Sequence, residues 1–562
     1  MKPASRANAA TRRILSLPVA SGRGSGFTCT RCRAAREAFI STETELKLAL
    51  RPNDLPALQD ALQAMAHKPQ AKSKTLVSTY FDTPERRLQS RRLTLRVREY
   101  DGRFIQTVKS AAEGSSPERG EWEDRIAGAT PDPEAPQTGR YLGDGVAERL
   151  RPVFATEVDR TAYTLAAGRD TRIEAAIDRG VIRLAAGAAG EEISEVELEL
   201  KRGSPTALYD AALRLLKVAP VRLSFDSKSR RGYRLLDPPA GPPKAVHADM
   251  PALDPALSGN AALQRIGRAC IDHLLRNEAA ALAGDPDGVH QMRVAARRLR
   301  AVLSAFSEWL PAKATRRVSR ELRWLAGALG PARNLDAFAT ALVRPLADDP
   351  GRPAGIQALA EAAEERRRET YAAAARAILS PRYTAAMLRI LRWFEGAEWR
   401  RARAARRLRR PIADIAPAVL ERRRRAARRH ARGFAELSAR RRHELRIALK
   451  KLRYASEALG SLYPAPVTEK FVKRLKRVQD ELGDANDVRV ARDILADLAR
   501  ANGRTLVSRA GRELIHWHAG RIARHEPKLR NHLRRLRRTE PFWRAAPPKA
   551  TGESRTGKVE RG

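Results

Sequence analysis

The sequence predicts an α+β protein of several domains, in which a β-barrel with a charged interior precedes a basic all-α domain. One observation is a period of two in charged and apolar residues, which recurs between residues 41 and 236 and is typical of strands. A second is the helical spacing of apolar residues from about Pro255 onward. The third is charge: the 562 residues carry a net +43, of which +2 falls in residues 41–240 and +34 in residues 241–562.

A Pro-rich segment separates the two predicted domains, since the run from Asp237 to Pro243 is too stiff to continue a helix or a strand. The first forty residues carry a net +7 and have no apolar segment followed by a cleavage site, so we expect no secretory signal. The predicted segments are a disordered basic extension at 1–37, the β-domain at 38–236, a Pro-rich linker at 237–255, the helical domain at 256–540 and a disordered tail at 541–562.

The composition restricts the partner and the compartment. A chain this basic is expected to bind a polyanionic partner, which can be nucleic acid, an anionic membrane or polyphosphate. No apolar stretch approaches 18 residues, so we expect no transmembrane helix. Three cysteines, Cys29, Cys32 and Cys270, cannot form a disulfide framework, which favours a reducing, cytoplasmic compartment. The lone Cys29–Cys32 pair has no second pair beside it, and we assign it no function.

In the first domain, charged residues occupy one face of each predicted strand. Glu43, Glu45 and Lys47 alternate with small or apolar residues, and similar runs recur at 93–98, 104–109, 119–125 and 195–200. Rows of both signs on like-facing positions indicate a barrel with a charged interior. Acidic rows can hold divalent cations through oxygen ligands, and basic rows can hold phosphate oxygens. The two together suit metal-assisted phosphoryl chemistry, in which a metal neutralises the substrate and positions an attacking water.

The motifs of this domain resemble the CYTH superfamily, the triphosphate tunnel metalloenzymes. Glu43-Thr-Glu-Leu-Lys47 matches the ExExK signature, and Tyr80-Phe-Asp-Thr-Pro84 with Leu95-Arg-Val-Arg98 resembles the YFDT…LRxR segment. The remaining motifs follow in family order at 106–109, 119–123, 173–180, 195–201 and 227–233. The resemblance covers residues 40–236. It implies an eight-stranded antiparallel tunnel that hydrolyses the terminal phosphate of triphosphate compounds with Mg²⁺ or Mn²⁺.

The resemblance also implies roles for individual residues. The implied metal ligands are Glu43, Glu45, Glu195, Glu197 and Glu199. The implied triphosphate ligands are Lys47, Arg96, Arg98, Lys109, Arg160 and Lys228. The acids that would bind a second metal or position the attacking water are Glu121, Glu123 and Asp178. For each of these residues the alternative is an internal salt bridge.

The second domain carries a repeated basic ridge. Apolar residues at helical spacing from Met292 to Phe306 predict a core-facing stripe. Another face of that helix carries His290, Arg293, Arg297, Arg298 and Arg300, and the same pattern returns as His443, Arg446, Lys450, Lys451 and Arg453. Like charges at this spacing repel, so such a helix is costly without an anion. Two such helices facing each other would form a basic groove in which histidine can donate to phosphate.

The ridge is part of an internal duplication. His290 and His443 are 153 residues apart, as are Gly330 and Gly483. Because glycine after an amphipathic run commonly ends a helix, we expect each of these two glycines to stop one.

This half resembles the CHAD domain, the conserved-histidine α-helical domain, over residues 256–540. The resemblance rests on the two ridges and on two Leu-Gly-x-x-x-[ND] segments. It implies two pseudo-symmetric helical bundles that bind inorganic polyphosphate through the ridge residues. The two halves differ after the glycine, with Arg333-Asn-Leu-Asp336 in the first and Asn486-Asp-Val-Arg489 in the second. The difference leaves open whether both halves contribute equally.

Polyphosphate fits this domain better than nucleic acid. Aromatic residues are 5% of the chain, and Trp309, Trp324 and Trp393 lie in runs that we assign to the core, so stacking platforms for bases are not evident. We therefore do not expect specific nucleic-acid binding. The arginine runs 406–410 and 422–425 are expected to be solvated helix faces.

The sequence thus predicts a metal-dependent inorganic triphosphatase fused to a polyphosphate-binding domain that associates with polyphosphate granules. One alternative is a non-catalytic polyphosphate-binding protein. Another is a tunnel enzyme acting on thiamine triphosphate or a nucleotide, including a class IV cyclase. The intact acidic rows favour an enzyme, because a pure anion binder gains nothing from Glu43, Glu45 and Glu197.

Overall fold

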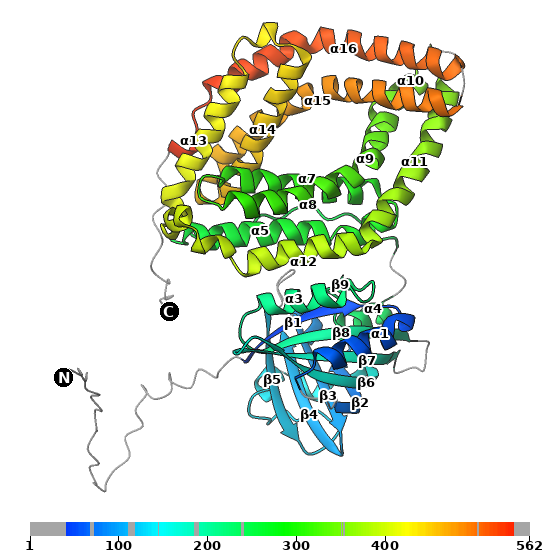
Figure 1. Cartoon of the computed structure of the whole chain (residues 1–562), viewed down its shortest axis with the longest axis vertical. Coiled ribbons are helices and arrows are strands. Elements are labelled where there is room, and N and C mark those ends of the chain that lie inside the picture. Colours follow the sequence, from blue (N-terminus) through cyan, green and yellow to red (C-terminus); the bar gives the residue numbers. More distant parts are fainter. Residues whose placement is uncertain are drawn as a thin grey trace, which may run out of the picture. The chain divides into compact units, whose positions relative to one another are not determined.

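The structure is a computed structural model that describes residues 41–67, 72–110, 118–143, 145–184, 190–237, 241–349, 351, 355–502 and 505–544. The predicted extension at 1–37, its Cys29–Cys32 pair and residues 545–562 lie outside the described residues. The N-terminal part of the chain forms a β-barrel and the C-terminal part forms a helical domain (Figure 1).

Eight antiparallel strands of the described chain close into a barrel, which confirms the predicted tunnel architecture. Their order is β5-β4-β3-β2-β6-β7-β8-β1, β1 pairs with β5 to close the ring, and the short β9 adds to β1. The strands are β1 Ser41–Ala49, β2 Lys72–Asp82, β3 Leu93–Tyr100, β4 Arg103–Ser110, β5 Glu118–Ile126, β6 Arg151–Ala167, β7 Thr171–Leu184, β8 Glu191–Arg202 and β9 Arg222–Ser224. The helices are α1 Leu55–Met65, α2 Arg87–Ser90, α3 Thr206–Leu215 and α4 Lys228–Leu236.

The alternation along β1 decides which side chains face the barrel interior. Leu48 is fully buried in an outer core that also holds Leu58 of α1 and Leu208 of α3. Successive side chains of a strand point to opposite faces. Glu45 and Lys47 therefore point inward, as the alternating pattern predicted.

Helix α4 and an aromatic cluster fill one end of the barrel interior. Tyr233 of α4 packs edge-on against Phe154 of β6, which stacks on Tyr80 of β2 with 4.5 Å between ring centroids. A Cβ at Gly232 would lie 2.3 Å from the Phe154 ring, so only glycine permits this approach. The packing of α4 carries its first residue, Lys228, into the polar part of the interior.

The helical domain follows the predicted amphipathic pattern. Ser258, Asp285 and Ser438 each cap a helix by accepting a hydrogen bond from an amide of its first turn. Within the described residues, every helix is too short or too polar to span a bilayer. The helices are α5 Gly259–Leu275, α6 Glu278–Leu282, α7 Pro286–Ala305, α8 Ala312–Ala328, α9 Gly330–Ala337, α10 Arg344–Ala347, α11 Ile356–Leu379, α12 Pro381–Glu395, α13 Ile412–His430, α14 Ala439–Leu459, α15 Ala465–Asn502 and α16 Thr505–Arg538.

The helix starts reproduce the sequence duplication. Helices α5, α7 and α8 of the first half begin 153 residues before α13, α14 and α15 of the second. The paired first residues are Gly259 with Ile412, Pro286 with Ala439, and Ala312 with Ala465. The halves then diverge, because α15 is one helix of 38 residues where the first half has the separate helices α8 and α9.

The expectation that Gly330 and Gly483 stop helices is wrong for the second and incomplete for the first. Helix α15 runs through Gly483, and α9 begins at Gly330, with only Leu329 between it and the end of α8. A Cβ at Gly330 would lie 2.9 Å from Nη1 of Arg293, and one at Gly483 would lie 3.8 Å from Nη2 of Arg446. Both glycines therefore lie against an arginine of the ridge, and the first provides space for its guanidinium.

The helical domain extends beyond both of its predicted boundaries. In the predicted linker, Val246 donates its amide to Oδ1 of Asn277 at 2.9 Å, so this part of the linker is bound to the domain. At the other boundary, Phe542 and Trp543 are buried against Phe471 of α15, although 541 was the predicted start of the tail.

Candidate functional site

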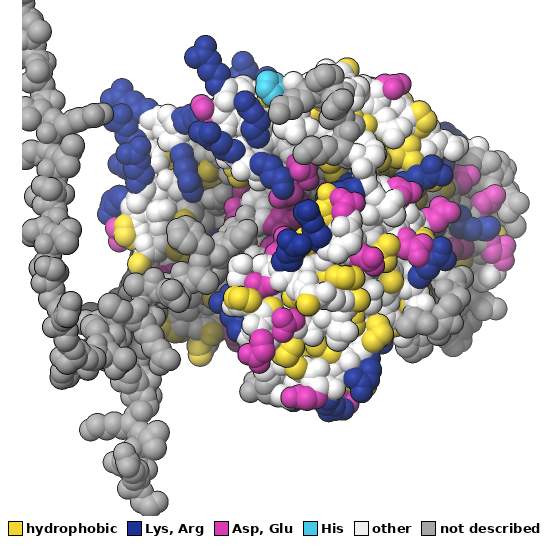
Figure 2. Space-filling view, turned by 90° about the horizontal axis from the view of Figure 1, so that it is seen from below, with side chains coloured by type: hydrophobic (Ala, Val, Ile, Leu, Met, Phe, Trp, Pro, Cys, Tyr) yellow, Lys and Arg dark blue, Asp and Glu magenta, His cyan; other side chains and the backbone are white. Residues whose placement is uncertain are grey.

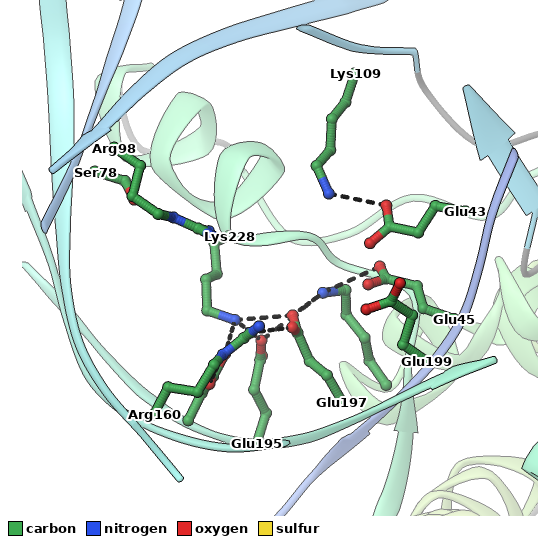
Figure 3. A network of polar contacts seen from close by, with 12 residues as sticks. Glu43, Glu45, Ser78, Arg98, Lys109, Arg160, Glu195, Glu197, Glu199 and Lys228 are labelled. Carbon is green, nitrogen blue, oxygen red and sulfur yellow. Dashed lines mark hydrogen bonds and ion pairs between the residues drawn. The ribbon is translucent and has the colours of Figure 1, made fainter. Parts of the chain in front are cut away.

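The strand register brings the predicted acidic and basic residues of β1 and β8 side by side. Glu45 lies opposite Glu199, and Lys47 lies opposite Glu197. Such cross-strand neighbours are within direct contact distance of each other. The two strands therefore present one mixed row of carboxylates and a lysine to the interior, and Figure 3 shows its carboxylates Glu45, Glu197 and Glu199.

Three carboxylates of the interior form a group that fits a divalent cation. One oxygen each of Asp178, Glu195 and Glu197 lies within 4.8 Å of the others. An all-oxygen donor set is the kind that Mg²⁺ and Mn²⁺ prefer. Nζ of Lys228 lies 2.6 Å from Asp178 and 2.9 Å from Glu197, so a lysine neutralises the group in this structure. Asp178, a predicted catalytic residue, thus lies with two of the predicted metal ligands.

Neighbouring cations keep this group ionised. Burial acts to raise the pKa of Glu197, but Lys228, Lys47 and Arg160 together hold it well below its usual range. Burial likewise opposes ionisation of Asp178, yet Lys228 and Arg160 lower its pKa. Arg160 joins the two by donating to Asp178 at 2.6 Å and also to Glu197.

The remaining predicted metal ligands lie in a second group, which Lys47 links to the first by contacting both Glu45 and Glu197. Nε of Arg119 is 2.7 Å from Glu43 and its Nη2 is 2.6 Å from Glu45. Burial opposes ionisation of Glu43, but Lys109 and Arg119 hold its pKa well below its usual value. Glu199, opposite Glu45 in the register, has a pKa raised by burial. Arg119 thus bridges two carboxylates that the sequence assigned to a metal.

The two other acids predicted to be catalytic differ in burial. Oε1 of Glu121 lies 2.7 Å from Nζ of Lys109, and burial raises its pKa although Lys109 acts against this. The Glu123 side chain is 48% exposed and accepts a hydrogen bond from Thr107 at 3.0 Å. Of the two, Glu121 is the one enclosed in the polar network.

Two arginines of β3, Arg96 and Arg98, form a cationic wall of the barrel interior. Arg96 lies 3.7 Å from Glu121, whereas Arg98 donates from Nε to Oγ of Ser78 at 3.2 Å (Figure 3). Among the described residues, Arg98 makes no ion pair with a carboxylate. Burial beside Arg96 and Arg160 lowers its pKa to about 10. Arg98 is therefore a buried cation without a carboxylate partner among the described residues.

The first ridge of the helical domain gathers around His290. Nε of Arg333 in α9 donates to Nδ1 of His290 at 2.8 Å. The neutral ring therefore carries its proton on Nε2. Burial and the cations Arg333, Arg297, Arg293 and Lys450 lower the pKa of His290 to about 4. Near pH 7 the ring is neutral and offers an N–H donor.

The second ridge has a different environment. Nδ1 of His443 lies 3.1 Å from Oδ1 of Asn486, whose Nδ2 lies 3.4 Å from Asp487. His443 therefore donates from Nδ1 in this arrangement. Burial lowers the pKa of Arg446, and it lowers that of Lys450 to about 7, while Asp487 acts to raise both.

Two predicted polyphosphate ligands are engaged in an internal ion pair. Arg298 lies 3.0 Å from Glu457, and Arg453 lies 3.4 Å from the same carboxylate. Both guanidinium groups also approach the ring of Tyr454. Arg298 is only 9% exposed, so this pair links α7 to α14 more than it faces solvent.

Arg300 and Lys451 lie near Arg423 of α13 in a further basic group. Burial, with Arg423 and Arg300 nearby, lowers the pKa of Lys451. Arg422 and Arg423 donate to backbone carbonyls at the C-terminal end of α7. The interpretation of run 422–425 as a solvated face is therefore wrong for these two arginines, which cap a helix.

Across the face seen in Figure 2, Lys and Arg side chains stand beside Asp and Glu side chains, so both signs of charge reach the surface.

Sequence reasoning did not single out three residues of these sites. Arg119 shares a strand face with Glu121 two residues away, so the alternating pattern contained the signal. Tyr80 is 3% exposed, and although burial acts to raise its pKa, Arg96, Arg98 and Lys228 together lower it; its signal was its place in a quoted motif. Arg333 was visible only as a difference between the two halves.

Family models match both domains of the chain. A model described as the CYTH domain matches residues 41–233, and one described as the CHAD domain matches residues 265–496. An inorganic triphosphatase of Haemophilus influenzae is 30% identical over 205 residues, which is 35% of this chain and 56% of that protein. The chain thus matches little more than half the length of that relative.

Solved structures resemble each part. The CHAD domain of the plant Ricinus communis is 28% identical with a TM-score of 0.47, covering 54% of this chain and 98% of that one. A Hippeastrum protein described by a dominant triphosphatase activity is 21% identical with a TM-score of 0.26, covering 33% of this chain and 93% of that one.

Proposed function

Taking the chain as one that contains a CYTH domain followed by a CHAD domain, we propose that it is a metal-dependent hydrolase of the terminal phosphate of inorganic triphosphate. One observation carries the proposal: the same barrel interior holds three carboxylates within 4.8 Å of one another and a buried arginine, Arg98, without a carboxylate partner among the described residues. In a protein that only binds anions, such carboxylates would weaken the binding, since they repel phosphate. The inorganic triphosphatase relative gives further support.

The carboxylates are assigned to a divalent cation. Asp178, Glu195 and Glu197 would hold Mg²⁺ or Mn²⁺, with Glu43, Glu45 and Glu199 as further oxygen donors. A cation there neutralises phosphate charge and makes a bound water more acidic. Lys228 and Arg160, which contact these carboxylates in the structure, would then be free to bind phosphate oxygens.

We assign binding of the triphosphate to the cationic wall and Lys109. Arg96, Arg98 and Lys109 would hold its oxygens through charge-assisted hydrogen bonds, which fixes the terminal phosphorus in place. We assign Glu121 to the attacking water, because a carboxylate with a raised pKa accepts a proton more readily near neutral pH. Positioning and charge stabilisation then supply most of the rate.

The test is phosphate release from tripolyphosphate, thiamine triphosphate and ATP, each with Mg²⁺ or Mn²⁺. Wild type should release phosphate fastest from tripolyphosphate, and Glu45→Ala should abolish most of the activity. Glu157→Ala is the matched control, because Glu157 is an exposed residue of β6 paired with Arg183. Equal rates for wild type and Glu45→Ala would exclude the enzyme. Faster release from another substrate would redirect the proposal to it.

We further propose that the helical domain binds inorganic polyphosphate and retains the protein at polyphosphate granules of the cytoplasm. Burial beside other cations lowers the pKa of Arg293 to about 10 and that of Lys450 to about 7. Cations in this condition are stabilised by any phosphate chain that contacts them. Such contacts do not require bases, so polyphosphate suffices as the ligand.

Retention on immobilised long-chain polyphosphate tests this second part. The double variant His290→Ala, Arg293→Ala should bind more weakly than wild type, whereas Arg406→Ala, which removes one exposed charge, should bind nearly as well. Circular dichroism checks that each variant is folded. If single-stranded homopolymeric DNA competes as well as polyphosphate at equal phosphate concentration, polyphosphate is not the preferred ligand.

A further inference from the structure

The two halves of the helical domain present equivalent helices but different charges beside the duplicated glycines, Gly330 and Gly483. Arg333 in the first half corresponds to Asn486 in the second, and Asn334 corresponds to Asp487, since each pair is 153 residues apart. The first half therefore places a cation and an amide where the second places an amide and an acid.

The two histidines occupy the same position and meet these different residues. His290 accepts from Nε of Arg333, so its proton lies on Nε2 and remains available while the ring is neutral. His443 faces Oδ1 of Asn486 with its Nδ1, so that nitrogen carries the proton. In the neutral ring, Nε2 of His443 is then an acceptor, whereas Nε2 of His290 carries the proton and can donate a hydrogen bond to a phosphate oxygen.

The surrounding charges differ in the same sense. After burial, the groups that act most on His290 are Arg333, Arg297, Arg293 and Lys450, all cations. In the second half, Asp487 acts on both Arg446 and Lys450 and partly neutralises them. Asp487 thus reduces the positive field at the second ridge, whereas the groups that act most on His290 are cations, one of them Lys450 of the second ridge.

Arg333 is also free to contact the ligand itself. Only its Nε is engaged, by His290, and among the described residues it makes no ion pair with a carboxylate. Its terminal nitrogens can therefore form two parallel hydrogen bonds to one phosphate group. The bond to His290 fixes the orientation of the guanidinium before the ligand arrives.

From these contacts we propose that the first half holds polyphosphate more tightly than the second, and that Arg333, oriented by His290, makes the difference. This inference rests on the proposed binding of polyphosphate by the helical domain. It concerns which half binds more strongly and which residue is responsible.

The duplication supplies its own test, because each half can be given the residues of the other. In the full-length protein, Arg333→Asn should weaken binding of long-chain polyphosphate about tenfold, as expected for loss of a charged hydrogen-bonding group. The double variant Asn486→Arg, Asp487→Asn should bind more tightly than wild type. A plot of log affinity against log salt concentration should be less steep in Arg333→Asn, its slope smaller in magnitude by about one, as for loss of one phosphate contact.

Arg406→Ala is the control for charge alone, and circular dichroism reports folding of every variant. If Arg333→Asn binds as wild type does, or loses no more than Arg406→Ala, the inference is overturned. If the double variant binds polyphosphate no more tightly than wild type, an arginine at this position does not raise the affinity and the inference is likewise overturned. If wild type binds no polyphosphate, it is the proposed function that fails first.

Discussion

The barrel interior and the helical ridges both gather cations, but the barrel encloses many more carboxylates beside them than the ridges, where Glu457 pairs with Arg298 and Arg453. Lys228 of the barrel has carboxylate oxygens of Asp178, Glu195 and Glu197 at 2.6, 2.5 and 2.9 Å. Burial would lower its pKa, yet these acids raise it. Lys450 of α14 makes no ion pair among the described residues, and burial beside arginines lowers its pKa to about 7. For two largely buried lysines, the neighbours decide the sign of the shift.

This difference separates two ways of handling a polyanion. Under the proposed function, a triphosphate in the barrel would take cations away from carboxylates, which would leave those carboxylates ready for a metal. On the ridges, the like charges repel one another until an anion arrives, so binding is favourable without a metal. The predictions that follow test how far the two regions differ in this respect.

The largest effect is expected from Glu197→Gln. The carboxylate of Glu197 contacts Lys47, Arg160 and Lys228, and removing its charge leaves three enclosed cations short of a partner. Breaking a buried ion pair on one side costs about 3–5 kcal/mol, so the free energy of unfolding at pH 7 should fall by that order. Denaturant unfolding of wild type and variant measures it.

The same variant has a defined pH dependence. The pKa of Glu197 in the fold lies well below its ordinary 4.5, so its contribution is complete above that pH and is lost as the pH falls below it. The difference in stability between wild type and Glu197→Gln should therefore shrink at acid pH. A difference that is constant down to pH 3 would mean that the carboxylate does not act through its charge.

The next effect concerns metal and substrate together. Arg119 and Lys109 contact Glu43, while Lys228 contacts Asp178. A metal that binds these carboxylates would free the cations for the triphosphate, and a triphosphate that binds these cations would free the carboxylates for the metal. Mg²⁺ and a tripolyphosphate analogue with NH bridges should therefore raise the unfolding temperature more together than the sum of each alone. Saturation at about 100 times the dissociation constant corresponds to about 2.7 kcal/mol. Additive shifts in thermal unfolding would mean that the two sites are independent.

Most of the fold could be predicted from the sequence, because both periodicities are local and strong. The alternation around Glu43 fixed the inner face of β1, and the 153-residue repeat predicted equivalent helices that begin at Pro286 and Ala439. The two glycines misled the prediction because a glycine that makes room for a side chain looks the same in sequence as one that ends a helix. Gly330 lies against Arg293 through tertiary packing, which the sequence does not display.

The candidate site was predictable by residue type but not by partner. The sequence indicated that acids and bases share the barrel interior, yet it could not show that Arg119 bridges Glu43 and Glu45 or that Asp178 joins Glu195. These contacts depend on which strands are neighbours, and β1 meets β5, which carries Arg119, only through closure of the barrel. In the same way, a basic ridge in sequence did not show that Glu457 neutralises part of it.

A smaller effect is expected from the titration of Lys450. Its pKa is about 7 in the folded protein and 10.5 ordinarily. Between these two pH values the lysine is protonated in the unfolded chain but not in the folded one. The stability of the ligand-free protein therefore rises with pH across this range. Polyphosphate favours the charged lysine, so affinity should fall above pH 7, by up to about tenfold per pH unit. Burial sets this pKa together with the neighbouring groups Arg446, Arg297, Arg453 and Asp487. In Lys450→Arg, which stays charged, affinity should change less between pH 7 and 9; equal pH profiles would contradict the assignment.

The smallest effect compares the two glycines. Gly483 lies inside α15, where an added Cβ would be 3.8 Å from Arg446, an ordinary contact. Gly483→Ala should therefore raise the free energy of unfolding by up to about 1 kcal/mol, through the helix preference of alanine over glycine. At Gly330 the Cβ would be 2.9 Å from Nη1 of Arg293, the same nitrogen that donates to the carbonyl of Ala326 at 2.6 Å. Gly330→Ala must displace that guanidinium, so it should gain no stability and should weaken polyphosphate binding, whereas Gly483→Ala should not. Equal stabilisation by both changes would mean that the first ridge does not depend on the position of Arg293, and the contrast between the two halves would lose one of its supports.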